Sequence, residues 1–480
     1  MARRVAVIDL GSNSLRMAIF ERTSRLGFYI LGEFKIKVRL AKGAYQNDGS
    51  ITKESMDECF EGLREFKKII KNYKATKILA VGTSALRDAP NSKTFINLVK
   101  KIGINLRVID GDKEAYYGGF AALNLLNLKT SATTIDIGGG STEFARIQDQ
   151  KIVETISINL GTVRLKEMFF DSGDFSGLDE FIARLISEIP SRFKNENLIV
   201  IGGSLRAISN AIMSELKYPL ETVHAFSYKY DKFSRFIDKI STAKISELDK
   251  FYIKKDRFDT IRAGANIFKK AVDFLNSKNI ITSGVGVREG VFLTNLLGLN
   301  RKFPANFNPS LKSLKDRFEI ENRTNIAKFA KSLFEILAPI HNIDKKYETE
   351  LITASKLVNI GLKTSFYSKH KHSAYLVLNS LNFGYTHEQK VLISSIIYIH
   401  GKKNFSQYDK FKSLLPQLSD IIWLSFIVEL ARILDEADIC GVRFEFSNQT
   451  LKIYGLKDEI YVKNSVKKLN KPDIFAITFN

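Results

Sequence analysis

Two short glycine-containing turns each combine an acidic residue with small, hydrogen-bonding residues. Residues 9–14 read Asp-Leu-Gly-Ser-Asn-Ser, and residues 136–141 read Asp-Ile-Gly-Gly-Gly-Ser. Each turn follows a run of β-branched and apolar residues that predicts a strand. Because glycine has no Cβ, such a turn exposes successive backbone N–H groups that can converge on the oxygens of a phosphate. The two turns therefore indicate phosphate binding.

The acidic residues of these turns, Asp9 and Asp136, would each lie at a strand end beside the glycines. A carboxylate repels free phosphate, so these residues fit beside an anion only with a divalent cation between them. Oxygen ligands and retained water suit Mg²⁺. One Asp-x-Gly turn is weak evidence because most such turns are structural, whereas two aligned copies favour a phosphate site.

The two turns belong to an internal repeat. The segment around the second turn aligns without a gap on the segment around the first, and residues 5–8 and 15–20 flank the first turn as the strands of a hairpin. The matched pairs are Asp9 with Asp136, Gly11 with Gly138, and Ser14 with Ser141. The copies are too far apart for a solenoid, and they predict two related lobes.

The apolar pattern along the first 300 residues alternates between strand and helix periods, which predicts an α/β architecture. The predicted helices span residues 53–72, 93–102 and 178–193, and the predicted strands span residues 77–81, 106–109, 152–158, 198–201 and 279–282. A further glycine turn, Gly202-Gly203-Ser204, follows the strand at 198–201. Beyond Pro304 and Pro309 the pattern predicts a mostly helical region over residues 311–434 and a small sheet within residues 443–479.

The composition indicates a multidomain globular protein of a reducing compartment. A length of 480 residues suggests roughly three domains at about 150 residues each. The hydrophobic share of 44% and the charged share of 26% are near globular averages. Cys59 and Cys440 are too few for a disulfide framework. The apolar run after the basic start stops at Asp9, and no stretch approaches the length of a membrane span, so we expect a soluble, cytoplasmic protein with no membrane partner.

The formal net charge of +21 is compatible with a nucleic acid, an anionic surface or a highly charged small anion as partner. Lysine-rich runs such as residues 67–68 and 100–101 also fit solvated helix faces. The sequence shows no base-stacking aromatic motif among its basic residues. We therefore predict no nucleic-acid partner.

Five motifs carry a resemblance to a known family in their order and spacing. They are residues 8–16, residues 82–87 (Gly-Thr-Ser-Ala-Leu-Arg), Glu114-Ala115, residues 136–143 and Arg288-Glu289-Gly290. Over about its first 300 residues the chain resembles the exopolyphosphatase and guanosine pentaphosphate phosphatase (Ppx/GppA) family.

This resemblance implies an α/β fold of the actin, sugar-kinase and Hsp70 superfold, with two ribonuclease-H-like lobes closing on a cleft. It also implies a mostly helical, HD-like C-terminal domain, to which we add the small terminal sheet. The predicted domains are residues 1–125 for the first actin-like lobe, 126–300 for the second, and 301–480 for the C-terminal domain.

The resemblance places the catalytic carboxylate at Glu114, in a helix that follows residues 108–111. A base there could take a proton from a water molecule attacking a terminal phosphoryl group, provided that it lies within about 3 Å of that water. The alternative is that Glu114, like Asp112, only complements a helix amino terminus, which is worth up to about 1 kcal/mol. Where the family commonly has a second acidic residue, this chain has Lys113, which would lower the pKa of Glu114 if the side chains meet.

The same resemblance implies that Asp136 and Glu143 hold Mg²⁺ and its waters, with Asp9 contributing from the opposite lobe. Other divalent cations, and K⁺ as a monovalent ion, stay open as alternatives. No Ser-His-Asp set is needed for this chemistry, and none of the six histidines falls within the motifs.

Three arginines, Arg16, Arg87 and Arg257, match basic positions of the family, and the family's Arg16 and Arg257 positions are implicated in binding nucleotide phosphates. An arginine fork binds phosphate with two parallel hydrogen bonds, although each arginine could also form a structural salt bridge. The other predicted substrate-binding residues are Ser12, Asn13, Ser14, Thr83, Ser84, Gly138, Gly139, Gly140, Ser141, Gly203 and Ser204.

The helical region resembles the family's HD-like region most clearly at residues 369–376, which read Lys-His-Lys-His-Ser-Ala-Tyr-Leu. A metal-dependent HD site needs a His-Asp pair, but the expected segment, residues 357–361, reads Leu-Val-Asn-Ile-Gly. We therefore expect no second hydrolase centre, and we interpret His370 and His372 as structural residues or as contacts to a polyanion.

The function that the resemblance implies is release of terminal orthophosphate from inorganic polyphosphate, guanosine pentaphosphate or both, by Mg²⁺-assisted attack of water. One alternative is a small-molecule kinase of the same superfold, and another is a non-catalytic sensor that binds (p)ppGpp or polyphosphate. The motifs do not distinguish the two substrates, although the charge of +21 favours the longer polyanion slightly. The length of polyphosphate also suggests a homodimer with a shared channel.

Overall fold

The computed structural model describes residues 3–40, 42, 48–320, 325–399, 406–437, 441–456 and 459–479 of the chain. It divides the chain into two compact units, Met1–Phe307 and Asn308–Asn480. The three predicted domains, divided after residues 125 and 300, remain a prediction. Each unit is described below by itself.

The first unit contains two mixed sheets that share one strand order. The first sheet runs β3-β2-β1-β4-β5, and the second runs β8-β7-β6-β9-β11 with β10 added at its edge. Among the five strands that the two orders share, the first three are antiparallel neighbours and the last three are parallel neighbours. The edge strand β10 is antiparallel to β11. The strands are β1 (Arg4–Leu10), β2 (Leu15–Arg22), β3 (Phe28–Ile36), β4 (Lys77–Gly82), β5 (Leu106–Val108), β6 (Ala132–Ile137), β7 (Thr142–Gln148), β8 (Lys151–Ile158), β9 (Asn197–Ile201), β10 (Ser227–Lys229) and β11 (Asn279–Thr282). The internal repeat thus extends from the two turns to two complete sheets.

Each predicted phosphate-binding turn closes a β-hairpin, as the sequence predicts. The turn between β1 and β2 is fixed by a hydrogen bond of 3.2 Å from the N–H of Gly11 to the carbonyl of Ser14. The turn between β6 and β7 has the equivalent bond of 2.9 Å, from Gly138 to Ser141. Because β1 and β6 are the central strands of their sheets, both turns rest on buried, fully paired backbone.

Helices cover the sheets of the first unit. They are α1 (Lys53–Asn72), α2 (Ser84–Asp88), α3 (Ser92–Lys101), α4 (Gly111–Leu125), α5 (Thr162–Leu165), α6 (Leu178–Ile186), α7 (Gly203–Glu215), α8 (Tyr230–Thr242), α9 (Ile261–Leu275) and α10 (Val287–Leu297). The predicted helix over residues 53–72 is confirmed as α1, but the single helix predicted over residues 178–193 is wrong. Helix α6 ends at Ile186 because Pro190 lacks an N–H and disfavours helical backbone in the residue before it.

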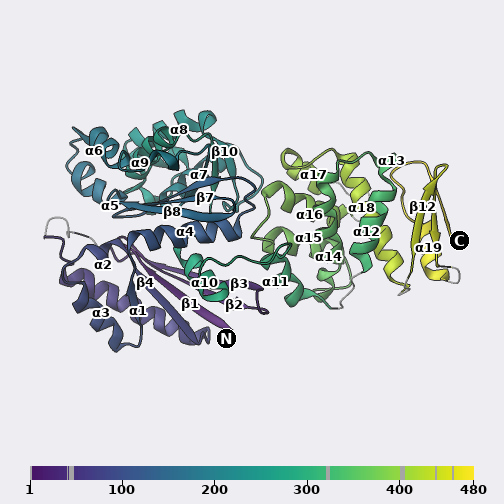
Figure 1. Cartoon of the computed structure of the whole chain (residues 1–480), viewed down its shortest axis with the longest axis horizontal. Helices are drawn as coiled ribbons and strands as arrows, with labels where there is room; N and C mark the ends of the chain where they lie inside the picture. Colours follow the sequence, from purple (N-terminus) through teal and green to yellow (C-terminus); the bar gives the residue numbers. More distant parts are fainter. Residues whose placement is uncertain are drawn as a thin grey trace. The chain divides into compact units, whose positions relative to one another are not determined.

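Two helices cross over between the sheets. Helix α4 follows β5 of the first sheet yet packs on β7 and β8 of the second, while α10 follows β11 and packs on β1 and β2. Figure 1 shows α4 between the two sheets. The two helices contact each other closely, because a Cβ added to Gly290 would lie only 2.0 Å from the carbonyl oxygen of Tyr117.

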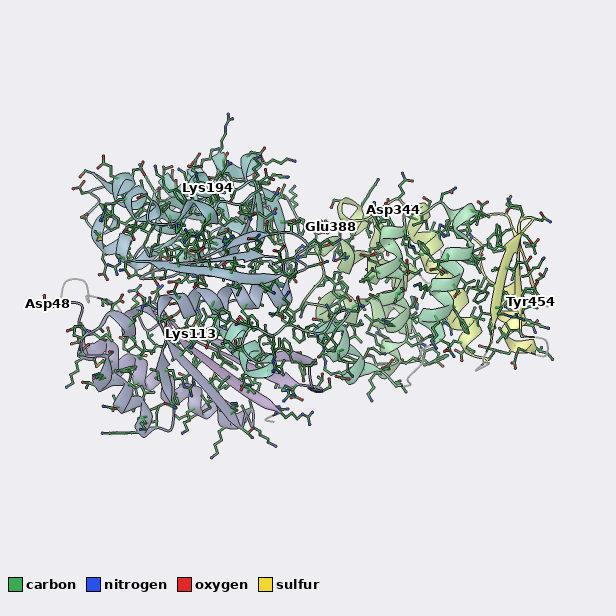
Figure 2. The ribbon with its side chains drawn as sticks, in the orientation of Figure 1. Asp48, Lys113, Lys194, Asp344, Glu388 and Tyr454 are labelled. Carbon is green, nitrogen blue, oxygen red and sulfur yellow. The ribbon has the colours of Figure 1, made fainter. Side chains whose placement is uncertain are left out.

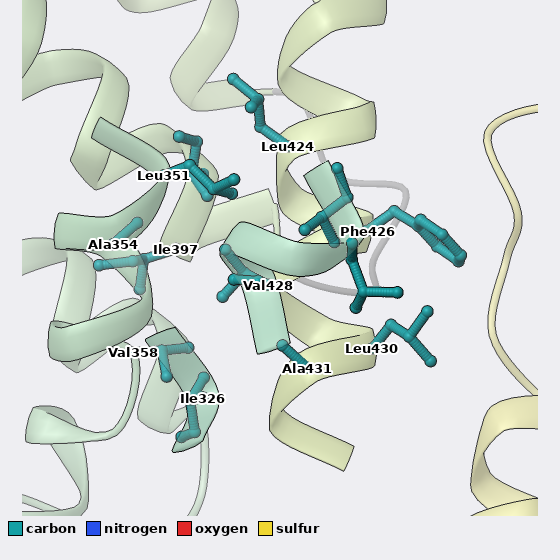
Figure 3. Close-up of a cluster of buried hydrophobic side chains, with 14 of the residues drawn as sticks. Ile326, Leu351, Ala354, Val358, Ile397, Leu424, Phe426, Val428, Leu430 and Ala431 are labelled. Atoms are coloured by element: carbon teal, nitrogen blue, oxygen red, sulfur yellow. The ribbon is translucent and has the colours of Figure 1, made fainter. Parts of the chain in front are cut away.

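The second unit is mostly helical and ends in a three-stranded sheet, as the sequence predicts. Its helices are α11 (Pro309–Phe318), α12 (Asn325–Ile336), α13 (Ala338–His341), α14 (Glu348–Leu357), α15 (Lys369–Ser380), α16 (His387–Ile399), α17 (Ser406–Phe411), α18 (Leu418–Asp435) and α19 (Ile460–Lys467), and its strands are β12 (Arg443–Ser447), β13 (Thr450–Tyr454) and β14 (Ala476–Phe479). Figure 3 shows its core, in which Ile326, Leu351, Ile397 and Leu424 come from four helices.

Within the described residues, no single helix is long and apolar enough to cross a membrane. Only the pair Ser406–Leu414 and Leu418–Asp435, bent by 118° between its members, meets the length and composition criteria together.

Candidate active site

A cleft in the first unit is lined by both glycine turns. Its volume is about 1020 Å³, counted with the solvent at its mouth. The turns face each other closely, because a Cβ added to Gly139 would lie 3.0 Å from the Cβ of Ser12. The segment after β4 adds Thr83 and Ser84 to the wall. The two halves of the repeat therefore present their backbone amides to one space.

Glu114 lies in the first turn of α4 and lines the cleft. Its Oε2 atom is 3.2 Å from Nη1 of Arg87. The amino terminus of α4 is already capped by Asp110, whose side chain accepts a hydrogen bond of 2.7 Å from the N–H of Lys113. Glu114 is therefore not needed as a helix cap, which weakens the purely structural interpretation of this residue.

Burial raises the pKa of Glu114 well above its usual range, and the neighbouring Glu143 carboxylate raises it further. Arg87 opposes both effects. The cation that meets Glu114 is thus Arg87, whereas the side chain of Lys113 is exposed on α4 (Figure 2). Lys113 was expected to lower the pKa of Glu114 only if the two side chains meet, and this condition is not met, because Lys113 is exposed and the cation beside Glu114 is Arg87.

Arg87 does not line the cleft but lies directly behind it. Besides Glu114, its guanidinium donates to the carbonyl of Ile109 at 3.1 Å and to Oγ of Ser141 at 3.4 Å. It thereby joins the first lobe to the second glycine turn. Its position is that of a residue that orients Glu114 and Ser141.

Besides Glu114, the carboxylates around the cleft include three predicted metal ligands. Asp9 and Asp136 line the cleft, and Glu143 lies behind it, opposite Asp136 in the β6–β7 register. The Ser157 hydroxyl donates a hydrogen bond of 2.9 Å to Glu143. Burial raises the pKa of Asp9, and it raises the pKa of Asp136 to about 6 against the opposing effect of Arg206. The pKa of Glu143 is raised by burial and by Asp136. Buried carboxylates that raise one another's pKa indicate a site short of positive charge.

These carboxylates suit a hydrated Mg²⁺ rather than a fully protein-ligated ion. Within the described residues, no group of three or more His, Cys, Asp or Glu side chains is arranged to hold a metal ion. Mg²⁺ is commonly bound through one or two carboxylates, several waters and substrate phosphates. Asp9 and Asp136, which face the cleft from opposite lobes, fit that mode.

Arginines provide the positive charge of the cleft. Arg16 lies opposite Asp9 in the β1–β2 register, and burial lowers its pKa to about 10, with Arg288, Arg206 and Arg257 contributing in the same direction. Such mutual repulsion favours an anion among these side chains. Arg257 rests against the start of α7, where a Cβ on Gly203 would lie 2.6 Å from its Nη1 atom.

Sequence reasoning missed two of these arginines. Arg206 lies one helical turn after Gly203 and donates to the carbonyls of Ser283 and Val285 at 2.9 and 3.3 Å. Arg288, part of a motif that carried the resemblance but was given no role, forms an ion pair of 2.8 Å with Glu33. Their proximity to sequence-identified motifs was the only signal that could have found them.

Ion pairs join residues at and just after the end of β3 to the segment before α9. Lys35 Nζ lies 3.2 Å from Asp256, and Lys37 Nζ lies 2.9 Å from Asp259. Arg39 also pairs with Asp259, at 3.2 Å. No sequence motif pointed to these residues, because the pairs join positions more than 200 residues apart.

The cleft thus contains every predicted site residue except Arg87 and Glu143, which lie behind its wall. Those that line it are Asp9, Ser12, Asn13, Ser14, Arg16, Thr83, Ser84, Glu114, Asp136, Gly138, Gly139, Gly140, Ser141, Gly203, Ser204 and Arg257. Several of the hydroxyl groups have protein partners: Thr83 donates to the carbonyl of Leu10, Ser84 donates to Asp88, and Ser14 and Ser141 accept from Arg16 and Arg87.

Two sheets of one strand order, with paired turns at a shared cleft and two crossing helices, define a two-lobed protein of the actin-like superfold. Residues 18–299 match the model of the Ppx/GppA phosphatase family, and residues 308–456 match domain III of the Ppx/GppA phosphatases. The chain therefore belongs to the Ppx/GppA phosphatase family, and its helical second unit carries the family's third domain.

Solved structures agree with this assignment. The Ppx/GppA family member of Aquifex aeolicus is 27% identical, with a TM-score of 0.54 over 63% of this chain and 100% of that chain. A second structure, of the Aquifex aeolicus PPX-GPPA enzyme, is 28% identical, with a TM-score of 0.52 over 61% and 100% of the two chains. An exopolyphosphatase from Cytophaga hutchinsonii, 22% identical with a TM-score of 0.53 over 61% and 97%, shares the fold.

Proposed function

We propose that this protein is a phosphohydrolase that releases terminal orthophosphate from inorganic polyphosphate, guanosine pentaphosphate or both. The observation that carries the proposal is the position of Glu114, which lines the cleft between two amide-rich turns and is held by Arg87. Family membership and the exopolyphosphatase activity named for a structural relative give independent support.

In the proposed reaction a carboxylate oxygen of Glu114 accepts a proton from water while the water oxygen attacks the terminal phosphorus. The bridging P–O bond breaks, the shortened chain keeps the bridging oxygen, and the terminal group leaves as orthophosphate. Backbone N–H groups of the turns at residues 11–14 and 138–141 hold the terminal phosphates. Arg16 and Arg257 neutralise charge on the phosphates, so positioning and charge compensation supply most of the rate.

Asp9 and Asp136 would hold Mg²⁺ through its water shell, with Glu143 behind them. The chemistry that such an ion would supply there is positive charge that offsets the carboxylates and the substrate phosphates. Other divalent cations and K⁺ remain alternatives to Mg²⁺ in the same proposal.

The surroundings of the cleft offer room for a long polyanion as substrate. A second cavity of about 740 Å³ shares Ser12, Asn13 and Thr260 with the cleft. It adds the cations Arg39, Lys42 and Lys166 and the carboxylates Glu167, Asp171 and Asp259, of which Asp259 pairs with Arg39 and Asp171 with Lys166. A polyphosphate chain could continue along these cations after its end is bound at Glu114. Guanosine pentaphosphate presents the same terminal phosphoanhydride, and we retain it as the second substrate.

The test is phosphate release from polyphosphate and from guanosine pentaphosphate by the full-length wild type and by Glu114→Gln, with Mg²⁺ and with EDTA. We expect Mg²⁺-dependent release by the wild type and a loss of at least about 100-fold in Glu114→Gln, the lower range for removal of a general base. Acceptor-dependent ADP formation without cleavage of either compound would support a kinase instead. Tight binding without turnover, unchanged in Glu114→Gln, would support a sensor.

We also propose that the active form is a homodimer, because a long polyanion extends beyond a single cleft. Light scattering at working concentration tests this part, and a monomeric mass would reject it.

A further inference from the structure

The surface around the start of α15 in the second unit has an unusual composition. From residue 351 to residue 387 the chain contains no Asp or Glu, whereas it contains Lys356, Lys363, Lys369 and Lys371. Exposed acidic residues usually accompany lysines on a soluble surface. This stretch therefore forms a positive patch within a single unit.

Three large aromatic side chains project from this patch. Phe366 is 71% exposed, Tyr367 is 82% exposed and Tyr375 is 67% exposed. A single exposed aromatic residue is ordinary, whereas neighbouring exposed rings such as those of Phe366 and Tyr367 are typical of a binding surface. The Lys369 ammonium lies 6.0 Å from the centre of the Phe366 ring, and the Phe366 and Tyr367 rings meet edge to face with centroids 5.7 Å apart.

The backbone beneath these rings is held firmly. The hydroxyl of Ser373 accepts a hydrogen bond from the N–H of Gly361 and donates one to the carbonyl of Val358, both at 2.8 Å. A Cβ on Gly361 would lie only 2.3 Å from the carbonyl oxygen of Lys369, so the segment before α15 packs directly on the helix. The rings are thus presented by a fixed scaffold.

Helical geometry extends the patch along α15. Lys371, Tyr375 and Asn379 are spaced by four residues, so they lie on one face of the helix, and all three are exposed. The first turn of α15 contains cations and no acidic residue, an arrangement that opposes the positive end of the helix dipole. An anion bound at this surface would relieve that repulsion.

A pocket of about 620 Å³ lies beside the patch and shares Lys369 with it. Its apolar wall includes Val358, Ile360 and Leu362. Within the described part of the chain, the Oδ1 atom of Asn359 is buried there without a hydrogen-bond partner. The pocket therefore offers a flat apolar group a buried acceptor and a neighbouring cation.

The two acidic residues of the pocket are already neutralised by partners on their own helices. Glu319 pairs with Lys315 at 3.1 Å, and Glu436 pairs with Arg432 at 3.0 Å. They leave the positive character of the surface intact.

We propose that this surface, formed by residues 356–375 with the adjoining pocket, binds single-stranded nucleic acid. Lys363, Lys369 and Lys371 contact backbone phosphates, and the rings of Phe366, Tyr367 and Tyr375 stack on bases. The pocket accepts one unstacked base, whose amino group donates to Asn359. Exposed rings among lysines are the arrangement by which proteins bind single strands with little sequence preference.

Stacking is the argument for nucleic acid over another polyanion. Polyphosphate would use the lysines of this surface but has no face that could cover the rings. The sequence expectation of no nucleic-acid partner rested on finding no stacking motif, whereas the structure exposes Phe366 and Tyr367 beside Lys369, and Tyr375 on the face of α15 that carries Lys371.

The test uses the full-length protein in EDTA, titrated into fluorescein-labelled 15-residue RNA and DNA strands of mixed sequence, with anisotropy as the readout. We expect saturable binding and a loss of about tenfold or more in the Phe366→Ala/Tyr367→Ala double variant, with an unchanged salt dependence. Each lysine that contacts a phosphate of a single strand contributes about 0.7 to the slope of log affinity against log salt. Removing two such charges in Lys363→Gln/Lys371→Gln should therefore lower the magnitude of this slope by about 1.4. The RNA and DNA arms show which strand is preferred.

Tyr461→Ala is the matched control, because Tyr461 is a tyrosine of similar exposure, 69%, on α19. We expect Tyr461→Ala to bind as the wild type does. A phenylalanine at residue 367 of the ring variant, giving Phe366→Ala/Tyr367→Phe, should restore binding. All of these variants should keep the phosphohydrolase activity and the melting temperature of the wild type. The proposal is overturned if the wild type does not bind either strand, if the ring variant binds equally well, or if Tyr461→Ala loses as much affinity. The proposal is also overturned if the ring variant differs from the wild type in mass by light scattering but not in affinity for either strand, since the surface would then serve self-association.

Discussion

Gly203 leaves room for the guanidinium of Arg257 at the wall of the cleft. A Cβ at residue 203 would lie 2.6 Å from Nη1, 2.9 Å from Nη2 and 3.0 Å from Cζ of Arg257. These distances are too short for any real contact, so Gly203→Ala must displace the guanidinium. Because the displaced group is the flexible end of a side chain and Gly203 begins the regular helix α7, we expect the fold to tolerate the methyl group.

The functional effect should be specific to substrate binding. A hydrogen bond to a charged group contributes about 1.5–3 kcal/mol, and each 1.4 kcal/mol is a factor of about ten. Gly203→Ala should therefore lower kcat/KM for polyphosphate by about 10- to 150-fold, with a melting temperature within about 2 °C of the wild type. The assay is initial-rate phosphate release over a range of substrate concentrations.

A double-mutant cycle separates this explanation from a general disturbance of α7. If Gly203→Ala acts only by moving Arg257, then Arg257→Met should abolish its effect, and the double variant should resemble Arg257→Met alone. Additive losses in the double variant, or an unchanged kcat/KM in Gly203→Ala, would refute the reasoning. Gly202→Ala serves as a contrast, because Gly202 has a φ of +95° and its Cβ would approach the backbone carbonyl of Ile137, so that change should destabilise the fold.

Three further predictions concern the ion pairs after the end of β3, the second unit and the crossing helices. Asp259→Asn should release Lys37 and Arg39, the two cations after the end of β3 that it pairs with. Since exposed ion pairs contribute about 0.2–1 kcal/mol, the change should lower the KM for long polyphosphate by up to about fivefold at low salt, and an unchanged or higher KM would contradict this role. Lys390 is 4% exposed, and burial lowers its pKa from 10.5 to about 8, so the folded state binds its proton less tightly than the unfolded state. The resulting penalty is fully present below pH 8 and disappears as the pH rises towards 10.5, so Lys390→Met should stabilise the second unit by about 3 kcal/mol at pH 7 and by much less at pH 10. Chemical denaturation at both pH values checks this, and an equal gain at both would exclude the titration as the cause. Gly290→Ala would place a Cβ 2.0 Å from the backbone carbonyl of Tyr117, so we expect a loss of more than about 3 kcal/mol in the free energy of unfolding, and a normal thermal melt would show that α4 and α10 can separate without cost.

The hairpins and the sheet order illustrate what the sequence could reveal. Alternating apolar residues before two glycine turns fixed the paired hairpins, because strand period and turn chemistry are local properties. The equal order of the two sheets was not accessible, since it depends on which distant strands pair. The helix predicted over residues 178–193 failed at Pro190, where a single residue overrides an otherwise helical apolar pattern.

The candidate site shows the same division. Asp9, Asp136 and Glu114 were found because each lies in a motif of local sequence. The ion pairs of Lys35 and Lys37 were missed, because they form only through folding of segments far apart in the chain, whereas Arg206 was missed although it lies three residues after Gly203. The pKa of Glu114 was also out of reach, since the effect of burial exceeds that of the adjacent lysine and can be assessed only from the packed structure.

The central claim is that water attacks the terminal phosphorus with Glu114 as the base. Hydrolysis of polyphosphate by the wild type in ¹⁸O-labelled water, followed by mass spectrometry of both products, tests it most directly. We expect one labelled oxygen in each released orthophosphate, none in the shortened chain, and a loss of this labelling rate in Glu114→Gln. Label in the shortened chain, or an equal rate in Glu114→Gln, would contradict it.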